Sequence, residues 1–247
     1  MIYQEPALTP QDKAVLGMIN KQREILKLYT QSNPRRWMGS LRRATLARAI
    51  QGSNSIEGYN ATLDEAMAVV NDEPRLDERT ETWFAISGYR TALTYIIQAA
   101  EDPTFEFSKQ FLKSLHFMMT GFDLNNRPGQ WRIGPIYVVR KKDGEPVYQG
   151  PDAELVDGLI CELVRYLKES DGTPLLVRAA MAHLNLTMIH PFRDGNGRMA
   201  RALQTLVLAR EGLLHPVFSS IEEWLGANTD EYYCVLAQKS KERWSPN

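Results

Sequence analysis

The chain has 247 residues, of which 43% are hydrophobic, so it can bury a substantial core as one large domain or as a domain with an appendage. Its net charge of −1 at pH 7 gives no basis for binding nucleic acid or an anionic membrane. It has neither an N-terminal apolar run nor an apolar span of about 18 residues. These features argue against a secreted or membrane-spanning protein, and we expect a cytoplasmic one.

Helical periodicity dominates the chain and predicts an all-α protein. Thr62 with Glu65, and Ser220 with Glu223, have the spacing of capping boxes. The two cysteines are expected to be buried thiols rather than a disulfide, because both lie on apolar faces. The helical segments lie near residues 11–30, 40–52, 62–71, 78–100, 108–120, 152–169, 174–189, 197–210 and 229–241, and the cysteines are Cys161 and Cys234.

The first segment that invites a functional interpretation is Ser53-Asn54-Ser55-Ile56-Glu57-Gly58, at the end of the second helical pattern. Taken alone, these residues predict a helix terminus. Gly58 would follow the last turn in a left-handed conformation, and Glu57 would be an ordinary exposed carboxylate. The six residues do not by themselves distinguish that interpretation from a functional carboxylate.

A β-hairpin is predicted near the middle of the chain. Residues 135–139 are β-branched and aromatic, Asp143-Gly144 is a turn signal, and Pro146-Val147-Tyr148 resumes an extended pattern. This is almost the only strand-like signal in the sequence. One interpretation is an incidental hairpin that covers a helical core.

The most informative segment is His-Pro-Phe-Arg-Asp-Gly-Asn-Gly-Arg, residues 190–198. Before it, Thr173 and Pro174 predict the start of a buried helix over 175–189. Pro191 and Gly195 interrupt the helical pattern, which resumes from Gly197. The sequence therefore predicts helix, tight loop, helix.

The residue types in this loop suit phosphate chemistry. His190 has an ordinary pKa near neutrality, as a general base requires. Asp194 offers the hard oxygen ligands that Mg²⁺ prefers. Arg198 and Arg201 share a helix face and can contact phosphate oxygens. The backbone of residues 195–197 carries the free N–H groups of a helix start, which bind anions.

Two further residues near the loop have alternative interpretations. Phe192 is expected to bury its ring and hold the loop in place. His183 lies almost on the same helix face as His190, so a transition-metal site formed by His183, His190 and Asp194 is conceivable. We expect His183 instead to be a buried structural histidine.

Across His190–Arg201 the chain resembles the Fic family, whose signature is H-P-F-x-(D/E)-G-N-(G/K)-R-x-x-R, and every constrained position matches. The resemblance implies a Fic-fold helical bundle with a small β-hairpin flap. It also implies a Mg²⁺-dependent protein adenylyltransferase that transfers AMP from ATP to a Ser, Thr or Tyr hydroxyl of a target protein, with self-modification as a further outcome. The implied roles are general base for His190, Mg²⁺ ligand for Asp194, phosphate cradle for Gly195, Asn196 and Gly197, and ligands of the outer phosphates for Arg198 and Arg201.

The same resemblance gives roles to the upstream segments. Residues 53–58 fit the family's inhibitory pattern (S/T)-x-x-x-E-(G/N), which implies that Glu57 pairs with Arg201 and blocks productive ATP binding. Some relatives also use this Glu to position water and remove AMP. The hairpin would be a flap whose edge pairs with the target, with Ile136 and Tyr137 at the docking position.

A Tyr-Tyr pair, Tyr232-Tyr233, follows the signature at the distance at which the family lines its adenine pocket, although core packing is the simpler interpretation. An Asn often stands seven residues beyond the second Tyr, and Ser240 occupies that position here. We therefore expect Tyr233 and Ser240 at the nucleotide.

The resulting domain prediction is a helical lead-in over 1–39 and a catalytic domain over 40–247, with the inhibitory helix near 45–58 and the flap near 133–150. Gly197 favours AMP transfer, since Lys there accompanies the family's kinase branch. A kinase or other phosphate-moiety transferase, and a silent ATP-binding regulatory protein, remain the alternatives. The chain's end at Lys241–Asn247 suggests a catalytic core cut from a longer protein, with apolar surface near Leu225, Tyr233 and Leu236 that favours a homodimer.

Overall fold

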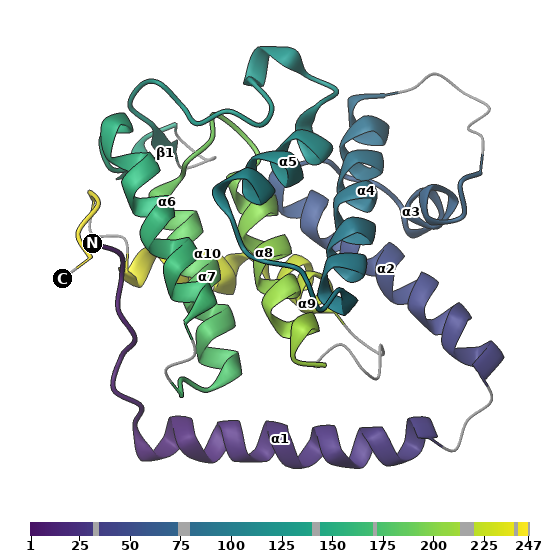
Figure 1. Ribbon diagram of the computed structural model, residues 1–247. Coiled ribbons are helices and arrows are strands. Elements are labelled where there is room, and N and C mark those ends of the chain that lie inside the picture. The colour runs from purple at the N-terminus through teal and green to yellow at the C-terminus, as the bar shows by residue number, and fades with distance from the viewer. Residues whose placement is uncertain are drawn as a thin grey trace.

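The computed structural model describes residues 1–31, 35–73, 80–139, 144–169, 172–212, 220–239 and 242–246. The prediction of an all-α fold with one small hairpin is confirmed (Figure 1). The elements are α1 (Pro10–Gln31), α2 (Arg35–Glu57), α3 (Leu63–Val70), α4 (Glu81–Glu101), α5 (Lys109–Thr120), a 3₁₀ turn (Leu124–Asn126), β1 (Tyr137–Val139), β2 (Pro146–Gln149), α6 (Ala153–Lys168), α7 (Leu175–Ile189), α8 (Asn196–Arg210), α9 (Ile221–Ala227) and α10 (Thr229–Lys239).

Helix α8 lies at the centre of the bundle, in contact with α7, α4, α2 and α9 (Figure 1). Leu203 and Leu206 of α8 and Leu186 of α7 are fully buried. Each such leucine contributes about 1.5–3 kcal/mol to stability. The central position of α8 matters for function because its first turn follows the loop predicted to be catalytic.

Side-chain caps start several helices as the sequence predicts. The Thr62–Glu65 capping box opens α3, and Ser220 caps α9 by accepting from the N–H of Glu223. Periodicity did not predict α9 because it spans only seven residues. The N-cap of α7 is Pro174 rather than Thr173, whose hydroxyl donates to Glu5 instead (2.7 Å).

The two described ends of the chain meet on one side of the bundle. The N–H groups of Ile2 and Tyr3 donate to Glu162 and Asn185, at 3.0 and 2.8 Å. The ring of Tyr3 packs edge-on against Trp244, with centroids 5.1 Å apart. Helix α1 runs along the edge of the molecule (Figure 1), and most of its described side chains are exposed.

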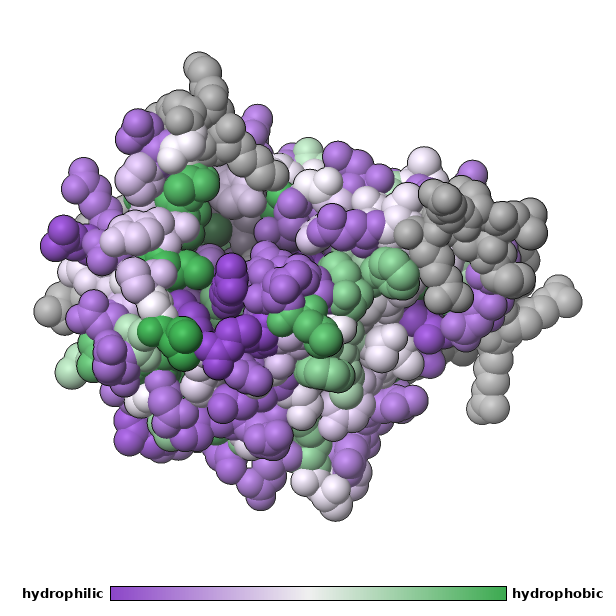
Figure 2. Space-filling view, turned by 90° about the horizontal axis from the view of Figure 1, so that it is seen from above, coloured by the Kyte–Doolittle hydropathy of each residue, from purple (hydrophilic) through white to green (hydrophobic). Residues whose placement is uncertain are grey.

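The hairpin is antiparallel, and Tyr137 lies opposite Gln149. The far side of β2 is covered at Gln149, whose N–H donates to Glu242 O (2.9 Å) and whose carbonyl accepts from Trp244 N–H (3.0 Å). Among the described residues, the outer edge of β1 has no such neighbour. Seen from above, the molecule has hydrophilic residues near the middle of this face and hydrophobic patches beside them (Figure 2).

The prediction of buried cysteines was wrong: Cys161 and Cys234 are free thiols, as expected, but both are exposed. The buried stripe of α6 includes Ile160, and the next residue along a helix points about 100° away from it. On α10 the only fully buried residue is Tyr232.

Three further expectations concern the domain boundary, membrane-spanning helices and self-association. The predicted boundary between residues 39 and 40 falls within α2, and the domain division stays a prediction. No helix in the described part of the chain is both long and apolar enough to cross a bilayer. Trp224, Tyr233 and Val235 expose apolar surface on α9 and α10, whereas Leu225 and Leu236 are half-buried. Self-association through this surface stays a prediction.

Candidate active site

The loop predicted to be catalytic, residues 190–195 and called the catalytic loop below, joins the end of α7 to the start of α8. His190 caps α7 in the left-handed conformation (φ 50°, ψ 59°), which costs a non-glycine residue about 1–3 kcal/mol. Three hydrogen bonds hold it there. Its N–H donates to Leu186 O (3.0 Å), its Nδ1 bonds Thr187 O (3.0 Å), and its carbonyl accepts from Arg132 Nε (2.8 Å).

The hydrogen bond to Thr187 determines the tautomer of His190. A carbonyl can only accept, so Nδ1 carries the proton and Nε2 keeps a free lone pair. Burial lowers the pKa of His190 below its ordinary 6.5, although the Thr187 bond and the Glu57 carboxylate act in the opposite direction. The imidazole is therefore neutral at pH 7, and Nε2 is ready to accept a proton.

The start of α8 is arranged to bind an anion. Gly195 is its N-cap with φ 74° and makes no side-chain cap. The Asn196 amide is committed to the loop, since it accepts from Phe192 N–H and donates to Phe192 O, both at 2.9 Å. Residues 195–197 can therefore offer their backbone to a phosphate, but the Asn196 side chain cannot.

Two buried arginines face this helix start with unused donors. Arg198 and Arg201 are 0% and 1% exposed. Three of their guanidinium nitrogens have no hydrogen-bond partner among the described residues, namely Nε and Nη1 of Arg198 and Nη1 of Arg201. An unsatisfied buried donor costs about 1–3 kcal/mol, and more when it is charged. Such a cluster is stabilised when an anion binds.

Glu57 occupies the space beside this helix start. It is the last residue of α2, and Gly58 (φ 96°) with the Tyr59 N–H to Asn54 O bond (3.0 Å) closes the helix as expected. Its carboxylate, however, is not an ordinary exposed one. Glu57 Oε1 lies 2.6 Å from Arg201 Nη2, and a Cβ on Gly197 would collide with it.

Ser53 strengthens the same contact. Arg201 Nε donates to Ser53 Oγ (2.8 Å), and Arg201 Nη2 donates to Ser53 O (2.9 Å). Burial alone would raise the pKa of Glu57, but Arg201 and then Arg198 hold it below 4.5. Burial disfavours the charged form of Arg201, yet the neighbouring Glu57 carboxylate raises its pKa above the ordinary value. Both groups are charged at neutral pH.

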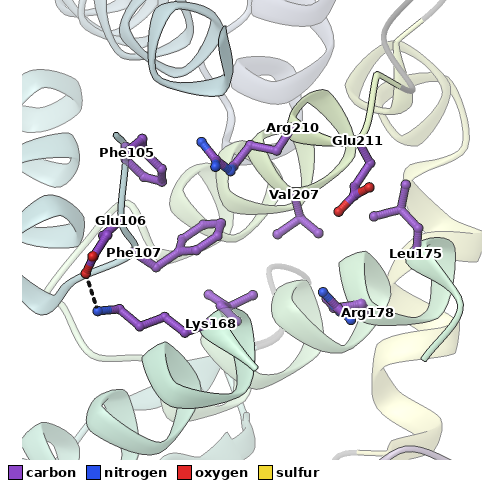
Figure 3. A pocket seen from close by; sticks show the side chains of 10 residues that line it. Phe105, Glu106, Phe107, Lys168, Leu175, Arg178, Val207, Arg210 and Glu211 are labelled. Atoms are coloured by element: carbon purple, nitrogen blue, oxygen red, sulfur yellow. Dashed lines mark hydrogen bonds and ion pairs between the residues drawn. The ribbon is translucent and has the colours of Figure 1, made fainter. Parts of the chain in front are cut away.

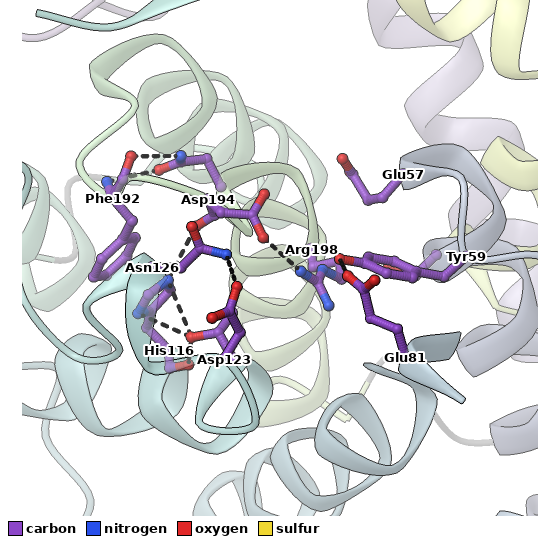
Figure 4. A network of polar contacts seen from close by, with 12 residues as sticks. Glu57, Tyr59, Glu81, His116, Asp123, Asn126, Phe192, Asp194 and Arg198 are labelled. Carbon is purple, nitrogen blue, oxygen red and sulfur yellow. Dashed lines mark hydrogen bonds and ion pairs between the residues drawn. The ribbon is translucent and has the colours of Figure 1, made fainter. Parts of the chain in front are cut away.

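Asp194 is the acidic residue of the catalytic loop. Its side chain is 42% exposed, and Oδ2 lies 3.3 Å from Arg198 Nη2 (Figure 4). One accessible carboxylate fits Mg²⁺, which takes few protein ligands and completes its shell with water and substrate phosphates. The described residues hold no group of three His, Cys, Asp or Glu side chains suited to a metal.

The expectation of a structural His183 is confirmed. It is buried, and its Nε2 lies 3.0 Å from the Tyr232 hydroxyl. Burial lowers the pKa of His183 to about 3, so the ring is neutral. The imidazole is thus engaged within the core, against a transition-metal role shared with His190 and Asp194.

Sequence reasoning missed His116 as part of the site. Its Nδ1 accepts from Gly129 N–H (2.8 Å), so its Nε2 is protonated and donates to Asp194 O (3.0 Å) (Figure 4). Its ring stacks on Phe192 at 3.7 Å, which confirms that Phe192 is a buried anchor. No sequence signal links His116 to Asp194 across 78 positions.

Tyr59 was also missed, although it follows the inhibitory pattern directly. Its ring lies 5.0 Å from the Arg198 guanidinium, and its hydroxyl donates to Glu81 (3.2 Å) (Figure 4). A cation over an aromatic ring is attracted to it, so Tyr59 helps to hold Arg198 in place.

The predicted nucleotide and flap residues lie as follows. Tyr233 is 41% exposed on α10, and burial, then Glu57, raises its pKa to about 12. Ser240 lies outside the described residues. Ile136 directly precedes β1 and is half-buried, whereas Tyr137 is 51% exposed on β1.

A cavity of ≈ 470 Å³ lies elsewhere, at the far end of α8 (Figure 3). Phe105, Lys168, Arg178 and Arg210 are among its lining residues, and none of the predicted site residues is. Since α8 has 15 residues, its two ends are about 20 Å apart. This cavity is therefore separate from the catalytic loop.

Known proteins resemble this chain in sequence and in fold. The model of the Fic/DOC family matches residues 106–208. A protein adenylyltransferase Fic from Drosophila yakuba is 30% identical over 212 residues, and a probable protein adenylyltransferase from Aquifex aeolicus is 31% identical over 94. The alignments cover 81% and 37% of this chain, and the chain spans only 39% and 29% of those relatives.

Among solved structures, a Fic family protein from Desulfovibrio desulfuricans superposes with a TM-score of 0.77. It is 27% identical, and the match covers 99% of this chain and 71% of that one. A Fic-1 structure from Caenorhabditis elegans, at 18% identity and a TM-score of 0.66, shares the fold.

Proposed function

Because the chain belongs to the Fic/DOC family, we propose that it is a protein adenylyltransferase that transfers AMP from ATP to a hydroxyl of a target protein. One observation carries this proposal above the others. A neutral His190 with a free Nε2 adjoins an α8 start at which two buried arginines have unused donors. A base beside an anion site is what phosphoryl-group transfer to a hydroxyl requires.

In the proposed reaction, the target hydroxyl oxygen attacks the α-phosphorus of ATP. The bond from that phosphorus to the bridging oxygen breaks, and pyrophosphate leaves. His190 Nε2 takes the hydroxyl proton. The backbone of residues 195–197 holds the phosphates, and Arg198 and Arg201 neutralise the charge of the outer ones. Gly197 favours this orientation of the nucleotide over the one used by the family's kinase branch.

Asp194 would hold Mg²⁺ together with the phosphates. When bound, the ion would supply further charge neutralisation at the phosphate oxygens. His116 supports this role, because its hydrogen bond to the Asp194 carbonyl fixes the orientation of the Asp194 backbone.

Autoinhibition is part of the same proposal. Arg201 is bound by Glu57 and Ser53 and is therefore withheld from the γ-phosphate. The Glu57 carboxylate also adds a negative charge where the phosphates would lie. A buried Glu–Arg pair of this kind suits a switch better than a source of stability.

Target docking would use the outer edge of β1. The neighbouring strand β2 is occupied at Gln149 by the backbone of Glu242 and Trp244, so β1 offers the hydrogen-bonding edge of the hairpin that no other described strand covers. An extended target segment would add to this edge as a further strand. Exposed Tyr137 would contact it, and Ile136 would lie beside it.

Parallel incubation with α-³²P-ATP and γ-³²P-ATP tests the proposal. Protein carrying Glu57→Gly is mixed with lysate and Mg²⁺, and the double variant with His190→Ala serves as the control. We expect label from α-³²P-ATP alone, on targets or on the protein itself. Label from γ-³²P-ATP alone would establish a kinase, and the absence of any label would favour the silent ATP-binding protein.

A further inference from the structure

Two buried side chains join the flap hairpin to the end of α7. The Tyr148 hydroxyl of β2 donates to Met188 O (2.6 Å). Arg132, which precedes β1, donates from Nε to His190 O (2.8 Å) and from its backbone N–H to Pro191 O (2.9 Å). Tyr148 is 4% exposed and Arg132 is 6% exposed. The carbonyls that end α7 are therefore bound from the flap side.

The rest of the Arg132 guanidinium is bound to the base of the hairpin. Nη1 donates to Gly134 O (2.7 Å), before β1, and Nη2 donates to Pro151 O, after β2. Gly150 packs closely over this arrangement. A Cβ there would lie 2.8 Å from Ile136 Cγ2 and 3.4 Å from Arg132 Nη2.

We infer that Arg132 is a positioning residue for the transfer reaction, which ties the carbonyl of His190 to both ends of the flap hairpin. The inference rests on the proposed adenylyl transfer and adds a residue to it. Arg132 does not touch the reacting atoms. It acts through the backbone of His190.

The physical argument begins with the left-handed conformation of His190. Such a conformation persists only where the surroundings determine it. The N–H and Nδ1 of His190 bond within α7 itself, so in the described part of the chain the bond from Arg132 to its carbonyl is the hydrogen bond that comes from outside the helix.

The planar guanidinium makes this constraint directional. Its donors are fixed in one plane, so they hold the carbonyls of Gly134, Pro151 and His190 in a fixed arrangement relative to one another. A shift of the hairpin base therefore reorients the carbonyl of His190, and with it the direction of Nε2. Lysine would supply a charge at this position but not the fixed geometry.

The test compares variants in the Glu57→Gly protein. Arg132→Gln and Arg132→Lys replace the guanidinium. Gly150→Ala keeps Arg132 but crowds the base of the hairpin to which the guanidinium is hydrogen-bonded. The matched control is Arg210→Gln, because Arg210 also donates to carbonyls at a helix end, Ala99 O (3.1 Å) and Asp102 O (3.2 Å), far from the loop. The measurements are the self-modification rate constant at saturating α-³²P-ATP and the affinity for α,β-methylene ATP.

We expect Arg132→Gln to lower the rate constant by about 100-fold, the effect of a small misplacement of a reacting group. Affinity for α,β-methylene ATP should be unchanged, which separates mispositioning from general damage to the fold. Arg132→Lys and Gly150→Ala should show smaller losses with the same unchanged affinity. Arg210→Gln should leave both quantities unchanged.

Two outcomes are distinguishable failures. If the Glu57→Gly protein itself transfers no α-label, the proposed function fails. If it transfers label and neither Arg132→Lys nor Gly150→Ala is slower than Arg210→Gln, the inference about Arg132 is overturned. This remains decidable even if Arg132→Gln does not fold.

Discussion

The proposed catalytic loop and the proposed inhibitory helix meet at Arg201, but they are built in different ways. The loop is one contiguous segment, and buried side chains hold its carbonyls at both ends: Arg132 at His190 and His116 at Asp194. The inhibitory contact joins Arg201 to Glu57 across 144 positions. The loop is contiguous and several hydrogen bonds fix its two ends, whereas the second contact depends on how a whole helix packs.

That helix packs against α9 through close backbone contacts. Gly52 of α2 lies against the backbone of Glu222 on α9, and Gly226 of α9 lies against Gly52 in turn. One ion pair, Arg48 with Glu223 at 3.0 Å, crosses the same contact. The contact of Glu57 with Arg201 thus depends on how α2 packs against its neighbours, whereas the ends of the loop are held by hydrogen bonds of their own.

The largest expected effect comes from removing the proposed general base. We expect His190→Ala in the Glu57→Gly protein to lower AMP transfer by about 10²–10⁴-fold, the usual effect of losing a general base. Affinity for α,β-methylene ATP should persist, because the α8 start and both arginines remain. Transfer measured with α-³²P-ATP at the unmodified rate would show that His190 is not the base.

Removing the inhibitory carboxylate should act in the opposite direction. We expect Glu57→Gly to raise AMP transfer by about 5- to 150-fold, the range of ordinary coupling between sites. The gain arises because Arg201 becomes available to the γ-phosphate. The assay is self-modification with α-³²P-ATP.

Arg201→Ala provides the contrast to this gain. It should not increase activity, since it removes the phosphate ligand together with the restraint. Equal activity of the Glu57→Gly and unmodified proteins on several targets would return Glu57 to the role of a simple helix-end residue.

The two regions also differ in how far the sequence predicts them. The loop was predictable because each of its functional residue types lies within twelve positions, at a spacing that helix periodicity converts into proximity. Its supports were not, since His116 and Arg132 reach it from far upstream and act through backbone carbonyls, which leave no pattern. The helix terminus at Gly58 followed from local chemistry.

The inhibitory contact itself required the family resemblance. The residues of 53–58 predict only a helix end, and nothing local points to Arg201. Short α9 was likewise outside the reach of periodicity, although Ser220 correctly predicted its cap. Long-range packing of one helix against another depends on shape, such as the close approach of Gly52 to Gly226.

A larger side chain between α2 and α9 tests whether their packing controls the position of Glu57. In Gly226→Ala, the new Cβ would lie 2.7 Å from Gly52 Cα and 2.9 Å from Gly52 O. Overpacking of this kind costs about 1–3 kcal/mol. We expect a lower melting temperature together with a gain in self-modification that is smaller than that of Glu57→Gly.

Gly158→Ala is the matched control for Gly226→Ala. Gly158 is also a helical glycine, but a Cβ there meets nothing within 4 Å. It should leave activity unchanged and stabilise α6 slightly. If Gly226→Ala showed no more self-modification than Gly158→Ala despite a lowered melting temperature, the packing of α9 would not control the position of Glu57.

The smallest expected effect is electrostatic and links the two regions directly. The Glu57 carboxylate raises the pKa of His190, although burial, the larger cause, keeps that pKa below 6.5. The pKa of Glu57 is itself below 4.5, so its charge stays constant wherever His190 titrates above that value. Removing the charge should therefore lower the pKa of His190 further.

NMR titration of the histidine ring carbons measures this shift without relying on activity, with His190→Ala identifying the signal. Glu57→Gln is the sharper variant, because it removes the charge and keeps the side chain's size. The neutral, basic form of His190 should then persist to lower pH than in the unmodified protein, and the acid limb of AMP transfer should move the same way. A pKa of His190 that rises on Glu57→Gln would mean that the carboxylate and the imidazole do not interact as the structure places them.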